Sequence, residues 1–373
     1  MAQRKAFSEF EESCIKPRFQ ASLREAEALF QQEKDTFKAQ FLNNMDKICS
    51  QHSDIGSDRR FAYMTWELLR TRMRVNQDEY RIMLYGKDWY LEPGIEAGTM
   101  DASLILQVYY QLEHQLKEDA KRYVGKITPI DVEHHVLYLL PPFHEYIKEL
   151  ILYAIADATE LEAFKGLRKE EEFQIRVGEC LEPGYLVYME KQKKCQEEIL
   201  EWLKSNRQEN FCFQDFQGLN FSGEDLSGYD LRNTDFRDAM LEGTKLCLSL
   251  LIGARFQRSS LRKAKLCGSM LHGADFSGAD LQKAHMEGTL MYDGKDSLNS
   301  WHLAGWPEGS FRGANLQEAV FRECIYCGAD FREADLHGAD FAGADLWRCR
   351  FTKEQLTQTG FTEEQKRQIC LIG

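Results

Sequence analysis

The residues best suited to chemistry are Cys324 and Cys327, which form a CxxC motif. Such a motif is typical of zinc binding or of thiol–disulfide exchange. A structural zinc site needs four ligands, and the chain contains no second CxxC. Cys324 also stands where neighbouring segments have alanine, whereas Cys327 follows the large Tyr326, so we expect the two thiols to point in different directions. We interpret both as space-filling residues, and likewise expect Cys247 and Cys267, twenty residues apart, to stack as free thiols.

Histidines gather in the segment EHHVLYLLPPFHEY, which contains His134, His135 and His144. Adjacent histidines face different sides of a helix, and the metalloprotease spacing HExxH is missing. The chain also lacks the phosphate-binding loops GxxxxGK[ST] and GxGxxG and the nucleophile elbow GxSxG. We therefore predict no catalytic, cofactor-binding or metal-binding residues, and no enzymatic activity.

The element that positions most of these cysteines is a repeat of five residues. From Phe211 to Met291, and in the same phase from Phe311 to Phe351, every fifth residue is large and apolar. The residue two positions before it is small from residue 234 onward, and the residue two positions after it is often glycine, which suits a turn in every repeat. Large and small residues would share a narrow interior, and the predicted core includes Phe216, Phe236, Phe256, Leu261, Phe276, Phe331, Leu336 and Phe341.

A longer period lies inside the short one, because phenylalanine recurs at 216, 236, 256 and 276. If four repeats make one coil, these rings form a column on one wall, which predicts a four-sided solenoid. Each coil would then bury its side chains only against its neighbours.

The segments GADFSGADLQKA, FRGANLQEAVF and GADFREADLHGADFAGADLW resemble the A(D/N)LXX units of the pentapeptide repeat family. The resemblance covers roughly residues 210–351. It implies an all-β right-handed quadrilateral β-helix with four repeats per coil.

The repeat is interrupted between Met291 and Phe311, and two interpretations stay open. The interval of twenty residues and the preserved phase favour a degenerate coil. Asp296, Pro307 and the small polar residues favour an irregular segment or loop over 292–310. As a loop, it would expose Trp301, His302 and Trp306 as a candidate contact with a partner.

Residues 1–205 are predicted to form a mostly helical α+β domain. Apolar residues from Leu23 to Ile48 fall near one face of an amphipathic helix. Alternation from Leu69 to Val75 predicts a β-hairpin that turns near residues 76–78, with Arg70, Arg72 and Arg74 as an exposed basic stripe for an acidic partner. Helices are expected to start at Asp101 as the N-cap and at Thr128–Pro129, with a break or kink at Pro141–Pro142. FQIRVGEC at 173–180 is predicted to be a strand, and MEKQKKCQEEILEWLKS a last helix that covers the first coil.

The N-terminal half also resembles the leading region of some pentapeptide repeat proteins of Firmicutes-type bacteria, through YRIMLYGKDWYL and FQIRVGEC. After the repeats at 206–351, residues 352–373 are expected to be a helical cap, because Thr352 with Gln355 and Thr362 with Gln365 fit capping boxes. The family resemblance implies that a homodimer can form through this cap, with Phe361, Ile369, Leu371 and Ile372 as contacts.

Composition excludes several classes of protein. The net charge of −13 does not favour direct nucleic-acid binding. No apolar run approaches 20 residues, so no membrane segment is expected. Eleven cysteines without an export signal indicate free thiols in a reducing, bacterial cytoplasm.

These observations lead us to expect a non-enzymatic protein–protein interaction scaffold without cofactors and with a protein partner. A second hypothesis comes from the quinolone-resistance members of the family, which mimic DNA and bind gyrase. Arg255, Arg258, Arg262, Lys263 and Lys265 make one segment locally positive and weaken that hypothesis. A third is a bacterial effector delivered into host cells.

Overall fold

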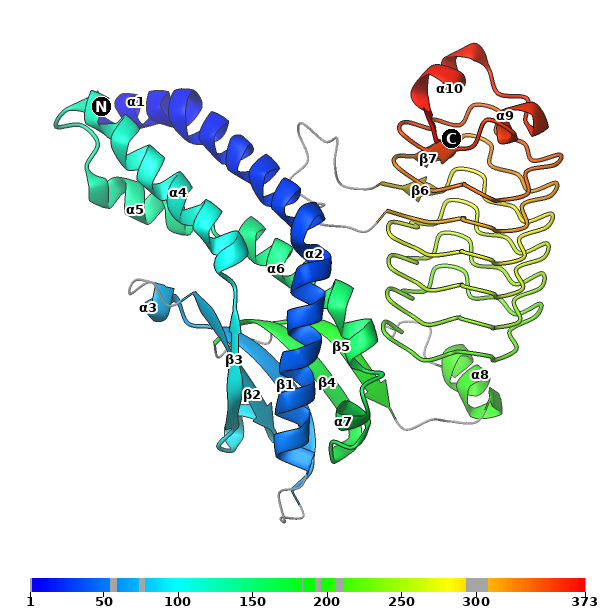
Figure 1. Cartoon of the computed structure of the whole chain (residues 1–373), viewed down its shortest axis with the longest axis horizontal. Helices are drawn as coiled ribbons and strands as arrows, with labels where there is room; N and C mark the ends of the chain where they lie inside the picture. Colours follow the sequence, from blue (N-terminus) through cyan, green and yellow to red (C-terminus); the bar gives the residue numbers. More distant parts are fainter. Residues whose placement is uncertain are drawn as a thin grey trace. The chain divides into compact units, whose positions relative to one another are not determined.

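The computed structural model describes residues 2–53, 59–73, 78–180, 182, 184–191, 196–205, 211–292 and 308–372. The chain divides into two compact units with a boundary between Met189 and Glu190. Figure 1 shows the elements of both units.

The first unit combines helices with one five-stranded sheet whose order is β3-β2-β1-β4-β5. β1 pairs antiparallel with β2 and parallel with β4. Its strands are β1 (Phe61–Leu68), β2 (Glu79–Tyr85), β3 (Ile95–Asp101), β4 (Lys169–Glu179) and β5 (Tyr185–Lys191). Its helices are α1 (Ala2–Phe10), the π-helix η1 (Glu11–Ile15), α2 (Lys16–Ser53), α3 (Arg70–Met73), the 3₁₀ turns η2 (Trp89–Leu91) and η3 (Lys121–Tyr123), α4 (Ser103–Ala120), α5 (Pro129–Leu137), α6 (Pro141–Ala158) and α7 (Glu162–Lys165).

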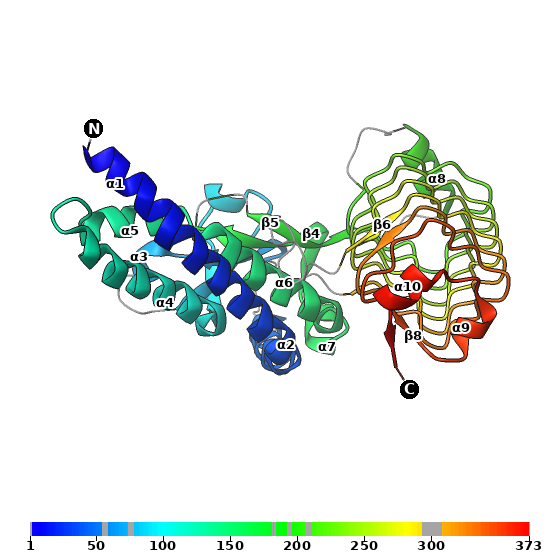
Figure 2. The same ribbon diagram turned by 90° about the horizontal axis from the view of Figure 1, so that it is seen from above.

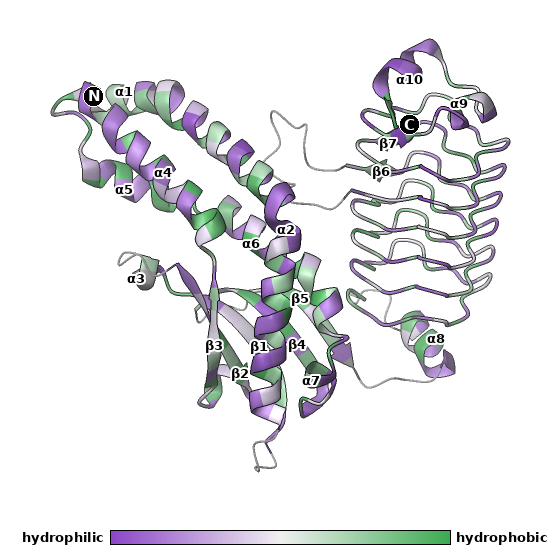
Figure 3. Cartoon of the chain, viewed as in Figure 1, coloured by the Kyte–Doolittle hydropathy of each residue, from purple (hydrophilic) through white to green (hydrophobic). Residues whose placement is uncertain are grey.

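The long helix α2 buries the apolar face that its sequence predicts, including Phe30 and Phe41 (Figure 3). The Phe41 ring stacks on Trp66 of β1 at 5.6 Å, and Tyr146 of α6 donates a hydrogen bond to the Leu23 carbonyl at 3.1 Å. Figures 1 and 2 show α2 running across the sheet. Because successive strand residues point to opposite faces, Met64, Trp66 and Leu68 meet the helices while Tyr63, Thr65 and Glu67 point the other way.

Several helix starts follow the capping rules. Thr128 and Asp131 form a complete capping box at α5. The predicted break at Pro141–Pro142 is present: α5 ends at Leu137 and α6 begins at Pro141, because a proline in the first turn lacks only an N–H that would have no partner there. Asp101 is the last residue of β3, and its carboxylate accepts a hydrogen bond from the Ser103 N–H at 2.8 Å, while Ala102 is the N-cap residue.

The predicted hairpin exists as the β1–β2 pair, but its strands are shorter than expected. Residues 70–73 form the helical turn α3, so the predicted strand does not continue through these residues. The turn buries Met73 in the core, and Arg70 pairs with Glu179 of β4 at 2.5 Å. The predicted last helix is also shorter, because residues 185–191 belong to β5 and α8 spans Gln196–Ser205.

The second unit is a solenoid in which parallel bridges join residues twenty apart, as in Asp215↔Asp235 and Asp235↔Arg255. Four repeats of five residues therefore make one coil. Most bridges involve single residues; the short strands are β6 (Leu290–Met291), β7 (Ile325–Tyr326), β8 (Arg350–Phe351) and β9 (Cys370–Leu371). The predicted core residues Phe216, Phe236, Phe256, Leu261, Phe276, Phe331, Leu336 and Phe341 are all buried.

The phenylalanine column forms as the twenty-residue period predicts. Phe236 and Phe256 stack at 5.0 Å between ring centroids, and Phe256 and Phe276 at 4.7 Å. The turn two residues after each large residue adopts a positive φ, for example +66° at Gly253. Glycine reaches this conformation without the steric cost that a Cβ brings.

The described flanks of the interruption overturn the degenerate-coil interpretation. Ser310 bridges directly to Asp275, thirty-five residues earlier, and the Phe276 and Phe311 rings stack at 5.0 Å. The coil that contains Ser310 and Phe311 therefore stacks directly on the coil that contains Asp275 and Phe276. The extra residues are a multiple of five, which is why the phase of the repeat survived. Residues 293–307 themselves lie outside the described part of the chain.

Both ends of the solenoid core are covered by helices. At the first coil, Ile199 and Leu203 of α8 join the core, and Tyr229 donates a hydrogen bond to the Leu203 carbonyl at 2.9 Å. At the last coil the covering helices are α9 (Gln355–Gln358) and α10 (Glu363–Gln368).

The buried side chains of Gln355 and Gln365 complete the last coil. Gln355 Nε2 donates to the carbonyls of Phe331 and Ala334, at 2.6 and 2.8 Å. Gln365 makes the equivalent pair of bonds, and Thr362 forms a complete capping box with it. At α9 the N-cap residue is Glu354, although the Thr352 N–H still donates to Gln355 Oε1 at 2.8 Å.

Two of the residues expected at a dimer contact belong instead to the chain's own core. Phe361 and Ile369 are buried against the last coil. Leu371, in contrast, is 46% exposed.

Candidate functional site

Residues from the two N-terminal motifs meet on the sheet face opposite α2. YRIMLYGKDWYL contributes Arg81, Tyr85, Trp89 and Tyr90, and FQIRVGEC contributes Arg176 and Cys180. The strand register explains the meeting, because Glu67 of β1 lies opposite Arg81 of β2 and Gly178 of β4.

The centre of this cluster is the Glu67 carboxylate, which is 1% exposed. Oε2 accepts a hydrogen bond from Arg81 Nη2 at 2.7 Å. Oε1 accepts from Thr65 Oγ1 at 2.8 Å, from the Tyr85 hydroxyl at 2.9 Å and from the Tyr90 hydroxyl at 3.3 Å. A buried charge is tolerated when it is paired and hydrogen-bonded in this way. The sequence analysis did not single out Glu67. The only feature that could have indicated it is its position as an acidic residue within an otherwise largely apolar strand.

The titratable neighbours of Glu67 stay protonated. Burial, and then the charge of Glu67, raises the pKa of Tyr90 to about 12 and moves the pKa of Tyr85 in the same direction. Burial also raises the pKa of the Cys180 thiol. Because a thiolate is the reactive form of cysteine, the cluster offers no activated nucleophile. It is a hydrogen-bonding centre that joins β1, β2 and the η2 turn, and Arg81 Nη2 extends it to the Cys180 thiol, just after β4, at 3.4 Å.

Trp89 covers part of this cluster in an uncommon backbone conformation. Its φ is +49°, which is rare for a bulky residue. Its ring stacks on Tyr63 at 4.2 Å, and the Arg176 guanidinium lies 5.2 Å from the ring centre. Cation–π contact of this kind helps to hold the segment on the sheet.

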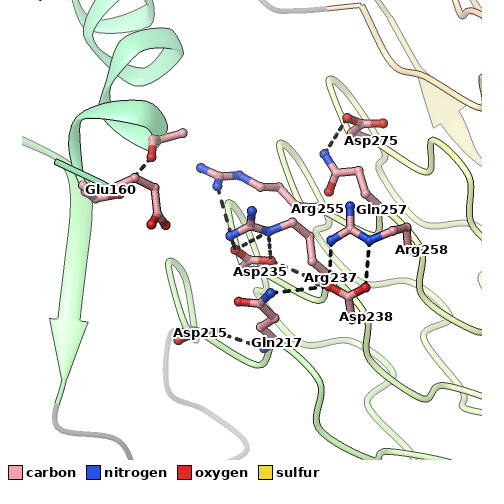
Figure 4. A network of polar contacts seen from close by, with 12 residues as sticks. Glu160, Asp215, Gln217, Asp235, Arg237, Asp238, Arg255, Gln257, Arg258 and Asp275 are labelled. Atoms are coloured by element: carbon pink, nitrogen blue, oxygen red, sulfur yellow. Dashed lines mark hydrogen bonds and ion pairs between the residues drawn. The ribbon is translucent and has the colours of Figure 1, made fainter. Parts of the chain in front are cut away.

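The outer surface of the solenoid carries a polar network on the wall that contains Asp235 (Figure 4). Arg237 donates to Asp235 from Nε at 2.9 Å and from Nη2 at 2.6 Å, and Arg255 Nη1 lies 3.8 Å from the same carboxylate. Arg258 holds Asp238 of the previous coil at 2.8 and 2.7 Å, and this hydrogen bonding lowers the pKa of Asp238. Asp235 and Asp238 are therefore neutralised by neighbouring guanidinium groups, whereas Asp275 accepts a hydrogen bond from the Gln257 amide at 2.6 Å.

Cys324 and Cys327, the two cysteines of the CxxC motif, are buried in the solenoid. Cys324 is buried and bonds to the Met286 carbonyl at 2.9 Å, whereas Cys327 lies near Arg348, at 3.7 Å from its Nη2, so the two thiols point differently. Burial, and then Glu287, raises the pKa of Cys267 to about 12. Cys247 and Cys267 are both free thiols.

His144 also serves a structural purpose. His144 contacts the Tyr80 hydroxyl through Nδ1 at 2.5 Å, and burial lowers its pKa to about 4. Across the described residues, no group of three or more His, Cys, Asp or Glu side chains is placed to hold a metal ion. In the same part of the chain, no helix is both long and apolar enough to span a bilayer.

Comparison with known proteins identifies the second unit. The sequence profile of the family described as pentapeptide repeats matches residues 215–251, 249–288 and 310–352, with eight copies. The second unit is a pentapeptide repeat domain. The sequence matches no curated protein.

Solved structures similar to the chain include three proteins with this repeat. A pentapeptide repeat protein of the cyanobacterium Cyanothece 51142 is 16% identical, with 40% of this chain and 95% of that one covered and a TM-score of 0.24. The plasmid-mediated fluoroquinolone resistance protein QnrB1 is 15% identical, with coverages of 43% and 94% and a TM-score of 0.23. HetL, involved in heterocyst differentiation regulation in Nostoc sp. strain PCC 7120, is 23% identical, with coverages of 41% and 95% and a TM-score of 0.14.

Two of the six predicted partner-binding residues, Arg70 and Arg72, lie in the described part of the chain. Arg70 and Arg72 lie in the helical turn α3 rather than on a strand, so they do not form the expected stripe. Arg74, Trp301, His302 and Trp306 lie outside the described residues, and their role as contacts stays a prediction.

Proposed function

We propose that this protein is a non-enzymatic scaffold for protein–protein interaction, and that the outer walls of the pentapeptide repeat domain are its contact surface. One observation carries the proposal. The inward positions repeat the same few residue types in every coil, whereas charge and polarity at outward positions vary from coil to coil. At one outward position, successive coils carry Asp235, Arg255, Asp275 and Ser310. Since packing needs only the inward residues, the outward ones are free to specify a partner.

We further propose the finer architecture that the family resemblance implies. The coil is a right-handed quadrilateral β-helix, which the four bridged positions in each twenty-residue coil support. The repeats extend to residue 351 and the cap spans 352–373, while α8 belongs to the second unit rather than to the first, and the protein acts in the cytoplasm. If a homodimer forms through the C-terminal cap, Leu371 and Ile372 are the apolar residues left for the contact, because Phe361 and Ile369 are buried.

The neutralised wall argues against DNA mimicry. A phosphate-like surface needs rows of unpaired negative charge, but Asp235 and Asp330 are each paired with an arginine in their own repeat, Arg237 and Arg332. QnrB1 is a fluoroquinolone resistance protein, so a gyrase supercoiling assay remains the decisive comparison. We expect no inhibition and no protection from the drug at micromolar protein. Inhibition would favour the DNA-mimic hypothesis.

The scaffold proposal is tested by crosslinking and affinity capture with the full chain in its native cell. We expect a stoichiometric protein partner that is lost when outward residues are substituted in a variant with unchanged thermal unfolding. Failure to recover any partner, or turnover of a substrate by the purified chain, would contradict the proposal.

A further inference from the structure

Two cysteines occupy the same outward position on successive coils of the pentapeptide repeat domain. Cys247 and Cys267 each follow a bridged residue by two positions, and the parallel bridge between Lys245 and Lys265 fixes their register. The Leu248 N–H also donates to the Cys267 carbonyl at 3.0 Å. Of the solenoid cysteines that the structure describes, only these two share one outward column. The backbone therefore holds the two residues directly above one another.

The two thiols are accessible and lie close together. Both side chains are partly exposed, so a small molecule in the solvent can reach them. The Cys247 thiol donates a weak hydrogen bond toward the neighbouring coil, to the Lys265 carbonyl at 3.6 Å. Burial, then Glu287 and then Cys247 raise the pKa of Cys267 to about 12, so the two thiols are near enough to interact.

The spacing of the coils suits a disulfide between these residues. Stacked strands lie about 4.8 Å apart, within the roughly 4.4–6.8 Å that a disulfide spans between Cα atoms. Two side chains that project in parallel keep their Cβ atoms about as far apart, slightly beyond the usual range of roughly 3.5–4.5 Å. A disulfide that is strained and partly exposed is easily reduced, and such disulfides are typically the regulatory ones. The site therefore favours a bond that forms and breaks over a permanent one.

We propose that Cys247 and Cys267 form a reversible disulfide that joins two adjacent coils when the surrounding thiol pool becomes oxidised. The free thiols of the structure are the reduced state of this pair. Each coil is stabilised only by its neighbours, so a covalent link between two coils acts where the stability of the solenoid is decided. The proposal goes beyond the scaffold function, and it holds whether or not a partner is bound.

The reaction consumes one small-molecule disulfide, such as oxidised glutathione. The Cys247 thiolate attacks one of its sulfurs, so that a mixed disulfide forms and one glutathione thiolate leaves. The Cys267 sulfur, after losing its proton, attacks Cys247 Sγ and expels the second glutathione thiolate. Each released thiolate takes up one proton, so two protein thiols are oxidised and one disulfide is reduced to two thiols. Cys247 attacks first, because Cys267 is held as a thiol that donates to Glu287 Oε2 at 3.2 Å.

The test equilibrates the full chain with glutathione buffers from fully reduced to fully oxidised, alkylates the remaining thiols and digests the protein with trypsin. Cleavage after lysine and arginine leaves Cys247 in peptide 246–255 and Cys267 in peptide 266–283, each with a single cysteine. Mass spectrometry should find these two peptides joined in the oxidised sample and separate after reduction. The midpoint of thermal unfolding of the solenoid should rise by about 5 °C or more on oxidation, because the bond closes a loop of about 20 residues.

Cys247→Ser and Cys267→Ser should each abolish both the joined peptides and the shift in the midpoint. Cys370→Ser removes an exposed thiol of the same unit and should leave both unchanged. Circular dichroism melts of the reduced proteins show that the variants are folded, and Cys247→Ala is a second variant at the same position. Peptides that stay separate in the fully oxidised buffer, or that are joined only between two chains on a non-reducing gel, would overturn the proposal. An oxidised chain whose midpoint does not rise would also overturn it.

Discussion

The two units of this chain are stabilised in opposite ways. In the first unit, residues far apart in sequence meet, as when Arg18 of α2 bonds to Asp119 of α4 at 2.9 Å. In the pentapeptide repeat domain, Phe256 stacks between rings twenty residues before and after it. The first unit should therefore unfold as a whole, whereas damage to the solenoid should spread mainly to neighbouring coils.

The largest expected effect comes from Glu67→Ala in the first unit. The change leaves the Arg81 guanidinium and three hydroxyl groups without their shared acceptor, so we expect a loss of about 3–5 kcal/mol in the free energy of unfolding. Hydrogen exchange followed by mass spectrometry should rise in β1, β2 and β4 together and stay unchanged in the solenoid. Glu171→Ala, at an exposed position of the same sheet, is the control. Equal hydrogen exchange in both variants would mean that the hydrogen bonds of Glu67 contribute nothing to the stability of the sheet.

Leu261→Ala is the corresponding test in the solenoid. Its side chain is fully buried, and its removal should cost about 2–5 kcal/mol. Exchange should rise most in the coils of Leu241 and Leu281 and decline with distance from them. Met240→Ala, which truncates a side chain that is 47% exposed, should change little. An unmoved unfolding midpoint in Leu261→Ala would contradict the inward placement of this residue.

Burial lowers the pKa of histidines in both units, His52 and His144 in the first and His272 in the solenoid. Burial lowers the pKa of His272 to about 4, and the Tyr292 N–H donates to its Nδ1 at 2.8 Å. As the pH falls, His272 binds a proton in the unfolded chain before it does so in the folded solenoid. The stability that the neutral imidazole contributes is therefore fully present above pH 6.5 and is lost as the pH falls toward 4. We expect a loss of about 2 kcal/mol in the solenoid between pH 7 and pH 5. His272→Gln should flatten this dependence in the solenoid only, while His144 keeps it in the first unit. An unchanged pH profile of the solenoid would refute the assignment.

The smallest expected effect is a gain in stability. Leu248 occupies a turn with φ of +58°, although its side chain is 74% exposed. Leu248→Gly should stabilise the solenoid by about 1 kcal/mol by removing the strain of the Cβ. Leu248→Ala keeps the Cβ and should show no such gain in thermal unfolding. A destabilised glycine variant would show that contacts of this leucine outweigh the strain.

Sequence reasoning succeeded where structure depends on near neighbours. The repeat register, the inward residues such as Leu261 and the capping box at Thr362 were all predictable, because each is set by residues close along the chain or at a constant spacing. It failed at residues 70–73, where the core position of Met73 and the ion pair between Arg70 and Glu179 outweigh the local alternation. It also missed the cluster around Glu67, whose members come from β1, β2 and the η2 turn.

The sequence alone determined that a solenoid of five-residue repeats follows a mixed α/β unit, because every coil carries the same inward pattern. Only the tertiary structure decided that Ser310 follows Asp275 in the stack, since an insertion of whole repeats leaves the period intact. It alone also showed that outward residues thirty-five positions apart, such as Leu290 and Ile325, align in one column. Such alignment depends on which residues the stacking places side by side, and the local sequence does not encode that.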